Sequence, residues 1–220
     1  MAFRGWPVEA IEFFDGLQAA NTKAYWQANK DVYEQCVKAP MVELLAELAP
    51  EFGAPKLFRP NRDVRFSNDK TPYKTHQGAV IIPEGSGVGS WYVQISAEGL
   101  RVAGGCWRLE SDQVSRFRRA VADPVQGPRL EQEVDRLAGA GFSIDGERLS
   151  RVPAGYSSDA DRVELLRHKA LHASRTWEPA EWLHTRKALE EVRSAWREMA
   201  TLNTWLAENV GATTKEVRRR

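Results

Sequence analysis

Residues 61–83 concentrate side chains that could bind an anion or move a proton, and they read NRDVRFSNDKTPYKTHQGAVIIP. Positions 62–74 hold four cations against two carboxylates, which leaves two positive charges without a local partner. Guanidinium, ammonium and hydroxyl groups together are the usual composition of a phosphate or carboxylate site. The pattern therefore predicts a site for a small anionic ligand. The ligand-binding candidates in this stretch are Arg62, Arg65, Lys70, Lys74 and Thr75.

The same stretch also contains groups that could transfer a proton. The catalytic candidates are Asp63, Asp69, Tyr73 and His76. An imidazole with an unperturbed pKa of ~6.5 is chemically suited to general acid or base catalysis. The sequence has no nucleophile elbow and no catalytic-triad spacing. It therefore assigns no reaction, and whether the protein is an enzyme stays open.

Two alternatives to a ligand site fit the same charges. The carboxylates could pair with the cations and brace a turn that Pro72 stiffens, with no ligand bound. The cations could also join Trp and Tyr side chains on an open surface that binds nucleic acid or another protein. A formal net charge of +1 provides no global attraction for nucleic acid, so we expect a small anionic partner instead. The sequence does not indicate an oligomeric state.

Gly104 and Gly105 lie next to each other inside an expected strand. A glycine in a strand costs ~1 kcal/mol relative to a residue with a side chain, so a pair of them has a structural reason. The pair indicates either a bulge or a place where another group approaches the backbone closely. In the second case the two glycines would leave room for the same anion, and they complete the set of ligand-binding candidates.

The sequence predicts no metal site and no cofactor. His168 and His172 are four residues apart, but no zinc-binding spacing surrounds them, and the glycine loop at 84–90 lacks both phosphate-binding and dinucleotide-binding motifs. Cys36 and Cys106 form no disulfide framework. The sequence has no signal-peptide pattern and no apolar run of the ~20 residues that a membrane helix needs. We expect a cytoplasmic protein without a membrane segment.

Hydrophobic periodicity predicts helices at both ends of the sequence. Residues 7–20, 21–38 and 40–48 form three helical segments, with Asn21 expected to cap the second. Helical patterns return at 111–123 and 127–141, and a short helix precedes 170. The C-terminal residues 179–210 have the apolar stripe of a long helix, broken near His184.

Strand patterns occupy the middle of the sequence. Residues 62–67 alternate, with Val64 and Phe66 on the apolar face, and 79–83 form a short buried strand. Residues 90–107 form a hairpin with Gly99 in the turn, Asp145-Gly146 predicts a second hairpin turn, and a last strand covers 170–174. The sequence predicts one α+β domain over residues 1–220, with its core at about 7–210. In it a mostly antiparallel sheet is flanked by N-terminal helices and a long C-terminal helix.

Four segments of the sequence occur together in an order that resembles the domain of unknown function 2461 family of cytoplasmic proteins. They are FFDGLQAANTKAYWQANKDVYEQCVKAPMVELLAELAPEF, RDVRFSNDKTPYKTH, GGCWRLESDQVSRFRRAV and LSRVPAGYSSDADRVELLRHKALHAS. The resemblance runs from about Ile11 to Val210 and implies a single domain but no activity. It directs attention to residues 62–75 and to Gly104, Gly105 and Trp107, while Leu109 stands where the family pattern has a proline.

Overall fold

The computed structural model describes residues 2–65, 67–85 and 87–215. They pack into two compact units, and each unit is built from three separate stretches of chain. Unit 1 consists of Met1–Ile81, Tyr92–Val102 and Thr176–Ala195, and unit 2 consists of Ile82–Trp91, Ala103–Arg175 and Trp196–Arg220. The prediction of one domain over residues 1–220 stays a prediction.

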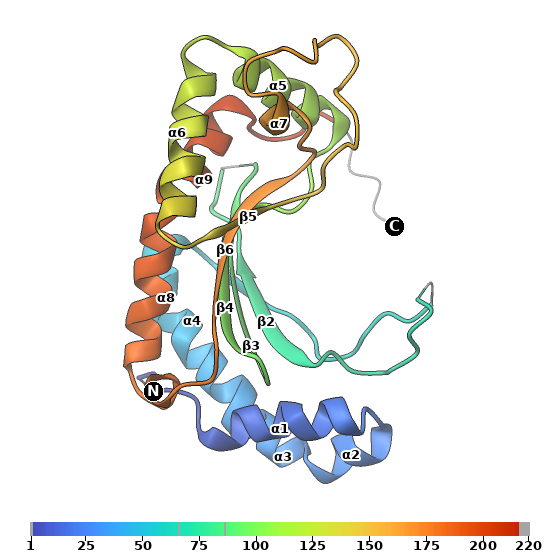
Figure 1. Ribbon diagram of the computed structural model, residues 1–220. Helices are drawn as coiled ribbons and strands as arrows, with labels where there is room; N and C mark the ends of the chain where they lie inside the picture. Colours follow the sequence, from blue (N-terminus) through green and yellow to red (C-terminus); the bar gives the residue numbers. More distant parts are fainter. Residues whose placement is uncertain (1, 66, 86, 216–220) are drawn as a thin grey trace. The chain divides into compact units, whose positions relative to one another are not determined.

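The structure belongs to the α+β class. Its strands follow the order β1-β2-β3-β4-β6-β5, and both β1 with β2 and β5 with β6 pair antiparallel. Figure 1 labels β2 to β6. The strands are β1 (Pro55–Leu57), β2 (His76–Ile81), β3 (Ser90–Ser96), β4 (Gly99–Cys106), β5 (Ser143–Asp145) and β6 (Leu171–Trp177). The predicted class is therefore confirmed, as are the hairpin at 90–107 and the strand near 170–174.

The helices of unit 1 come mainly from the N-terminal part of the chain. They are α1 (Val8–Ala19), α2 (Lys23–Ala28), α3 (Lys30–Val32), the π-helical η1 (Tyr33–Lys38), α4 (Ala39–Phe52), the 3-10 turn η2 (Glu181–His184) and most of α8 (Lys187–Glu198). The side chain of Thr22 caps α2 by accepting a hydrogen bond from the backbone N–H of Tyr25 at 3.1 Å. The expectation that Asn21 caps this helix was therefore wrong.

The core of unit 1 is aromatic and aliphatic. Phe3 and Trp6 are fully buried, and their rings meet edge to face with centroids 5.1 Å apart. Phe14 and Leu17 of α1 are buried with Leu44 of α4. Both α1 and α4 contact η1 in this unit.

Unit 2 contains the helical segments that follow the hairpin. They are α5 (Ser111–Ala122), α6 (Gln126–Gly139), α7 (Val163–Leu166) and α9 (Ala200–Asn209), and α8 (Lys187–Glu198) contributes its last residues. Phe117 and Trp205 pack edge to face at 5.9 Å in its core. Asp112 at the start of α5 accepts hydrogen bonds from the hydroxyls of Thr213 and Thr214, which fixes the chain after α9.

Three further predictions of local structure were wrong. The expected strand at 62–67 does not form among the residues described there, where the backbone is a loop; Phe66 lies outside the described residues. The Asp145-Gly146 pair does not turn a hairpin, since β5 pairs with the distant β6. The long C-terminal helix is interrupted between α8 and α9 at Met199, in addition to the predicted break near His184.

Candidate functional site

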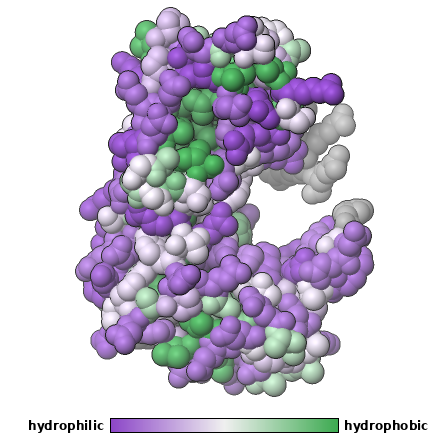
Figure 2. Space-filling model, viewed as in Figure 1, coloured by the Kyte–Doolittle hydropathy of each residue, from purple (hydrophilic) through white to green (hydrophobic). Residues whose placement is uncertain are grey.

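Residues 61–73 form a loop, here named the charged loop, that is closed at its base. Asn61 and Tyr73 form an isolated antiparallel bridge. The N–H of Arg62 donates to the carbonyl of Pro72 at 2.9 Å, and the N–H of Lys74 donates to the carbonyl of Pro60 at 2.8 Å. The described surface of this loop is predominantly hydrophilic (Figure 2). The predicted ligand-binding segment is therefore one loop of unit 1, and it is not a half-buried strand.

Tyr73 anchors the base of the charged loop to the N-terminal helices. Its ring is buried and stacks on Trp26, with centroids 4.3 Å apart and planes at 10°. The side chain of Asn21 makes two hydrogen bonds to the Tyr73 backbone. It donates to the carbonyl at 2.9 Å and accepts from the N–H at 3.1 Å. Tyr73, predicted as a catalytic candidate, thus has an evident packing role.

Both carboxylates of the charged loop are paired within it. Asp63 accepts two hydrogen bonds from the guanidinium of Arg65, at 2.9 and 2.7 Å. Asp69 accepts from the N–H and hydroxyl of Thr71 at 2.9 and 2.8 Å and also pairs with Arg62. These contacts lower the pKa of Asp63 to about 2, chiefly through Arg65, and the pKa of Asp69 to about 2, chiefly through Thr71. Both side chains are therefore ionised near neutral pH.

The pairing in the loop predicts a residue-specific acid titration. A carboxyl whose pKa is depressed adds stability that is complete above the usual value of ~3.9 and is lost as the pH falls toward 2. Arg65→Gln is expected to return the pKa of Asp63 toward ~3.9 and to leave that of Asp69 near 2. Carboxyl-carbon NMR resolves the two groups. A pKa near 3.9 for Asp63 in the unaltered protein, or a joint shift of both groups in the variant, would contradict the pairing.

The two remaining lysines of the cluster bond to neutral partners. The ammonium of Lys70 donates to the carbonyl of Val64 at 3.0 Å, and that of Lys74 donates to the carbonyl of Arg59 at 3.1 Å. Burial, with a contribution from the nearby Arg59, lowers the pKa of Lys74. Because carbonyls carry no net charge, these bonds neutralise neither lysine, and the positive surplus expected for positions 62–74 is present in the folded chain.

His76 begins β2 directly after the loop and is half-buried. Burial lowers its pKa, and the positive charges of Lys74 and Arg62 lower it further. The imidazole is therefore neutral at pH 7 and retains a basic nitrogen. Its role as a general acid or base stays a prediction, and so does a ligand-binding role for the half-buried Thr75.

Gly104 and Gly105 belong to unit 2, whereas the charged loop belongs to unit 1. A Cβ at Gly104 would lie 3.1 Å from both the Met199 and Trp91 side chains. A Cβ at Gly105 would lie 2.5 Å from the Cα of His172 on β6. The close approach that the glycine pair indicated is thus made by the protein's own packing, and we leave both residues out of the proposed site.

A cavity of about 420 Å³, here named the unit 1 cavity, opens beside the base of the charged loop. Its walls come from α2, α3 and η1 on one side and from β1 and the residues after it on the other. The lining residues are Trp26, Lys30, Tyr33, Glu34, Lys38, Leu57, Phe58, Arg59, Pro60 and Asn61. None of these residues was among the candidates from the sequence, and Phe58, Arg59 and Lys38 carry no motif signal.

The charges around the unit 1 cavity are unbalanced. Glu34 is the one carboxylate among the described residues that line it, and it is paired with Lys38 at 2.6 Å. Lys30 and Arg59 are exposed, and no carboxylate within the described part of the chain forms an ion pair with either of them. Three cations against one carboxylate leave two positive charges at the cavity, the combination that attracts an anion.

A buried amide supports the inner wall of the unit 1 cavity. Gln77 is 1% exposed and accepts a hydrogen bond from the Tyr33 hydroxyl at 2.6 Å. Its amide nitrogen donates to the carbonyls of Phe58 at 2.9 Å and Gly78 at 3.0 Å. Gln77 therefore joins η1, the end of β1 and β2, and it fixes two of the residues that line the cavity.

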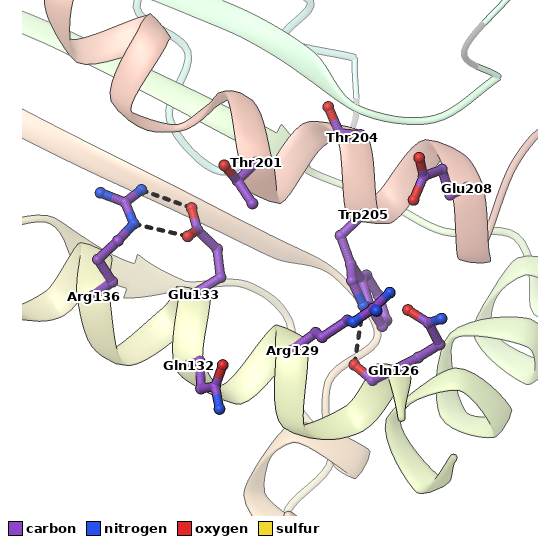
Figure 3. A pocket seen from close by; sticks show the side chains of 9 residues that line it. All are labelled: Gln126, Arg129, Gln132, Glu133, Arg136, Thr201, Thr204, Trp205 and Glu208. Atoms are coloured by element: carbon purple, nitrogen blue, oxygen red, sulfur yellow. Dashed lines mark hydrogen bonds and ion pairs between the residues drawn. The ribbon is translucent and has the colours of Figure 1, made fainter. Parts of the chain in front are cut away.

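Unit 2 contains a cavity of about 440 Å³ between α6 and α9, and its charges are balanced (Figure 3). Its lining holds Arg129 and Arg136 together with the carboxylates of Glu133 and Glu208. Arg136 makes two hydrogen bonds to Glu133, at 2.8 and 2.7 Å, and the indole of Trp205 donates to a backbone carbonyl at 3.1 Å. Because its two arginines are matched by two carboxylates, this cavity has no charge preference for an anion.

A further cavity in unit 2, of about 660 Å³, has its charges largely paired. Arg108 lies 3.8 Å from Glu110, and Lys169 pairs with Glu147. The guanidinium of the remaining cation, Arg118, donates to a backbone carbonyl at 3.1 Å. This cavity has three cations against two carboxylates, a surplus of one positive charge. The unit 1 cavity, with a surplus of two, has the largest of the three.

Within the described residues, no group of three or more His, Cys, Asp and Glu side chains is arranged to hold a metal ion. A ring nitrogen of His168 lies 2.8 Å from the carbonyl of Ala170, and the His172 ring packs against Trp107 with centroids 3.9 Å apart. Separately, none of the helices described by the structure has the length and apolar character to cross a membrane.

Comparison with known proteins identifies one family. The family described as "Conserved hypothetical protein (DUF2461)" matches residues 9–205, which include the charged loop and every residue lining the unit 1 cavity. No curated protein matches the sequence.

Proposed function

The chain belongs to the DUF2461 family, whose description names no activity, and we propose from its geometry that it binds a small anionic ligand in the unit 1 cavity. The observation that carries the proposal is the surplus of two positive charges around a cavity of about 420 Å³ with aromatic and aliphatic walls. Ligand pockets of soluble proteins have this size, with mostly apolar walls and a few placed polar groups.

Lys30 and Arg59 are the residues proposed to contact the anion directly. Each side chain is exposed, and no ion pair has to break before it can contact a ligand. The carbonyl of Arg59 accepts a hydrogen bond from the ammonium of Lys74, so the residue directly after the charged loop holds the backbone of a proposed binding residue. In this arrangement the loop positions the site, and its own carboxylates are already occupied by Arg65 and by Thr71 with Arg62.

A concave site favours a small ligand over nucleic acid. Nucleic-acid surfaces track a long backbone with many cations and lose affinity steeply as salt rises. Here the proposed site is a cavity with a surplus of two positive charges, and the net charge of the chain is only +1. A cytoplasmic location belongs to the proposal as well, and the free thiols of Cys36 and Cys106 fit a reducing compartment.

Thermal unfolding with inorganic phosphate, sulfate and citrate at constant ionic strength tests the proposal. At ten times the Kd a ligand stabilises the native state by about 1.4 kcal/mol, which corresponds to a Tm rise of about 3–5 °C at this chain length. We expect at least one anion to produce this rise and Arg59→Gln to abolish it.

Arg65→Gln is the matched control, because it removes an exposed guanidinium that lies outside the cavity lining. It is expected to keep the full anion response. The proposal fails if no anion raises the Tm of the unaltered protein, or if Arg59→Gln and Arg65→Gln lose the response equally.

A further inference from the structure

The unit 1 cavity contains an aromatic ring whose position is fixed by its neighbours. The ammonium of Lys74 lies 5.2 Å from the centroid of Phe58, and the ring of Tyr92 lies 6.3 Å from it at 35°. The backbone carbonyl of Phe58 is held by the buried amide of Gln77. A ring held in this way is preorganised, so contact with a ligand requires little further ordering.

Apolar surface continues from Phe58 along the same side of the cavity. Leu57 and Pro60 flank it in the sequence and are half-buried, and Trp26 lines the opposite side. Trp26 is already stacked on Tyr73, so its ring is a fixed wall. An inorganic anion would leave this apolar surface in contact with water, whereas a ligand with an organic ring would cover it.

The charge surplus specifies the other part of the ligand. Two uncompensated positive charges match a dianion better than a single carboxylate. A phosphate monoester is close to doubly charged at pH 7, because its second pKa is about 6, and it has three acceptor oxygens. Lys30, Arg59 and the amide of Asn61 line the same cavity and offer donors to such a group.

We propose that the ligand of the unit 1 cavity is a phosphate monoester with an aromatic ring, its phosphate at Lys30 and Arg59 and its ring against Phe58. This inference rests on the proposed function and adds the chemical class of the ligand. The fixed aromatic wall and the double positive surplus are separate observations, and they specify the two ends of the molecule independently.

Isothermal titration calorimetry with matched probes tests each end. Phenyl phosphate and methyl phosphate differ in the ring, and phenyl phosphate and methyl phenyl phosphate differ in the second negative charge. We expect phenyl phosphate to bind at least tenfold more tightly than either of the other two compounds. Phe58→Leu keeps an apolar side chain without the ring, and it is expected to reduce the preference over methyl phosphate to less than threefold.

The outcomes separate this inference from the proposed function. Equal binding of phenyl and methyl phosphate, lost in Arg59→Gln, would overturn the aromatic ligand and leave anion binding intact. Equal binding of phenyl phosphate and methyl phenyl phosphate would overturn the claim that the ligand is a dianion. If no phosphate compound or other anion binds, the proposed function fails together with the inference. Lys23→Gln, an exposed substitution on α2 outside the cavity, is expected to change none of these affinities.

Discussion

Gln77→Leu is expected to lower the free energy of unfolding by about 3–4 kcal/mol. The substitution replaces the polar amide with an apolar side chain of similar size at a position that is 1% exposed. It removes the acceptor of the Tyr33 hydroxyl and the donor to the carbonyls of Phe58 and Gly78. The Gly78 carbonyl keeps the hydrogen bond from the Phe58 N–H at 3.0 Å, so the cost comes from the Tyr33 hydroxyl and the Phe58 carbonyl. Each buried polar group left without a partner costs about 1–3 kcal/mol. Urea unfolding of the variant and the unaltered protein measures the difference.

Tyr33→Phe is the comparison variant for Gln77→Leu, because it removes only one of the three hydrogen bonds made by the Gln77 side chain. It is expected to cost about 1–2 kcal/mol, and the double variant should cost less than the sum of the two single variants because they share a bond. Strict additivity would contradict the network. A loss below about 1 kcal/mol in Gln77→Leu would show that the amide does not support the cavity wall.

Gly105→Ala is expected to cost at least about 3 kcal/mol of unfolding free energy. Gly105 has φ +128°, a conformation that residues with a side chain rarely adopt. The added methyl group would also lie 2.5 Å from the carbonyl oxygen of Leu171 and the Cα of His172, both of which are backbone atoms of β6. Strand pairing prevents those atoms from moving away cheaply, so strain and overlap act together.

Two other glycines serve as controls for Gly105. Gly139 is the last residue of α6, and a methyl group added there would have no neighbouring atom within 4 Å, so Gly139→Ala should be neutral or stabilising by up to about 1 kcal/mol. Gly104→Ala meets only side chains, at 3.1 Å, and should fall between the two. Chemical denaturation of the three variants gives the order, and a Gly105→Ala protein as stable as Gly139→Ala would contradict the close approach of β6.

Hydrophobic periodicity predicted the helices and strands whose buried residues recur at regular spacing along the chain. The apolar stripe of α6 and the alternation of β3 are local patterns, and the structure confirms both. The predicted strand at 62–67 has the same alternation but did not form. The backbone N–H of Arg65 donates to the Asp63 side chain there at 3.3 Å, and a bond of this kind between positions two residues apart favours a local turn over a strand.

The cavity was less accessible to sequence reasoning than the charged loop. The loop is continuous in the sequence, so its charges could be counted, and the pairing of Asp69 with Arg62 follows one of the arrangements expected. The cavity combines Trp26 and Lys30 with Phe58 and Arg59, which are distant in the sequence and belong to no recognisable motif. Their proximity depends on how the N-terminal helices pack next to β1, and no local pattern specifies that packing.

The hydrogen bonds that tie Arg62 to Pro72 and Lys74 to Pro60 also determine where this chain can change length. These bonds close the loop between Arg62 and Pro72. Each doubling of the length of a closed loop adds only ~0.6 kcal/mol of entropic cost. Phe58 and Arg59 precede the tie, so an insertion beyond it would leave the cavity wall in place. The tip can therefore be lengthened, labelled or exchanged independently of the residues proposed to bind, and recognition and loop length can vary separately.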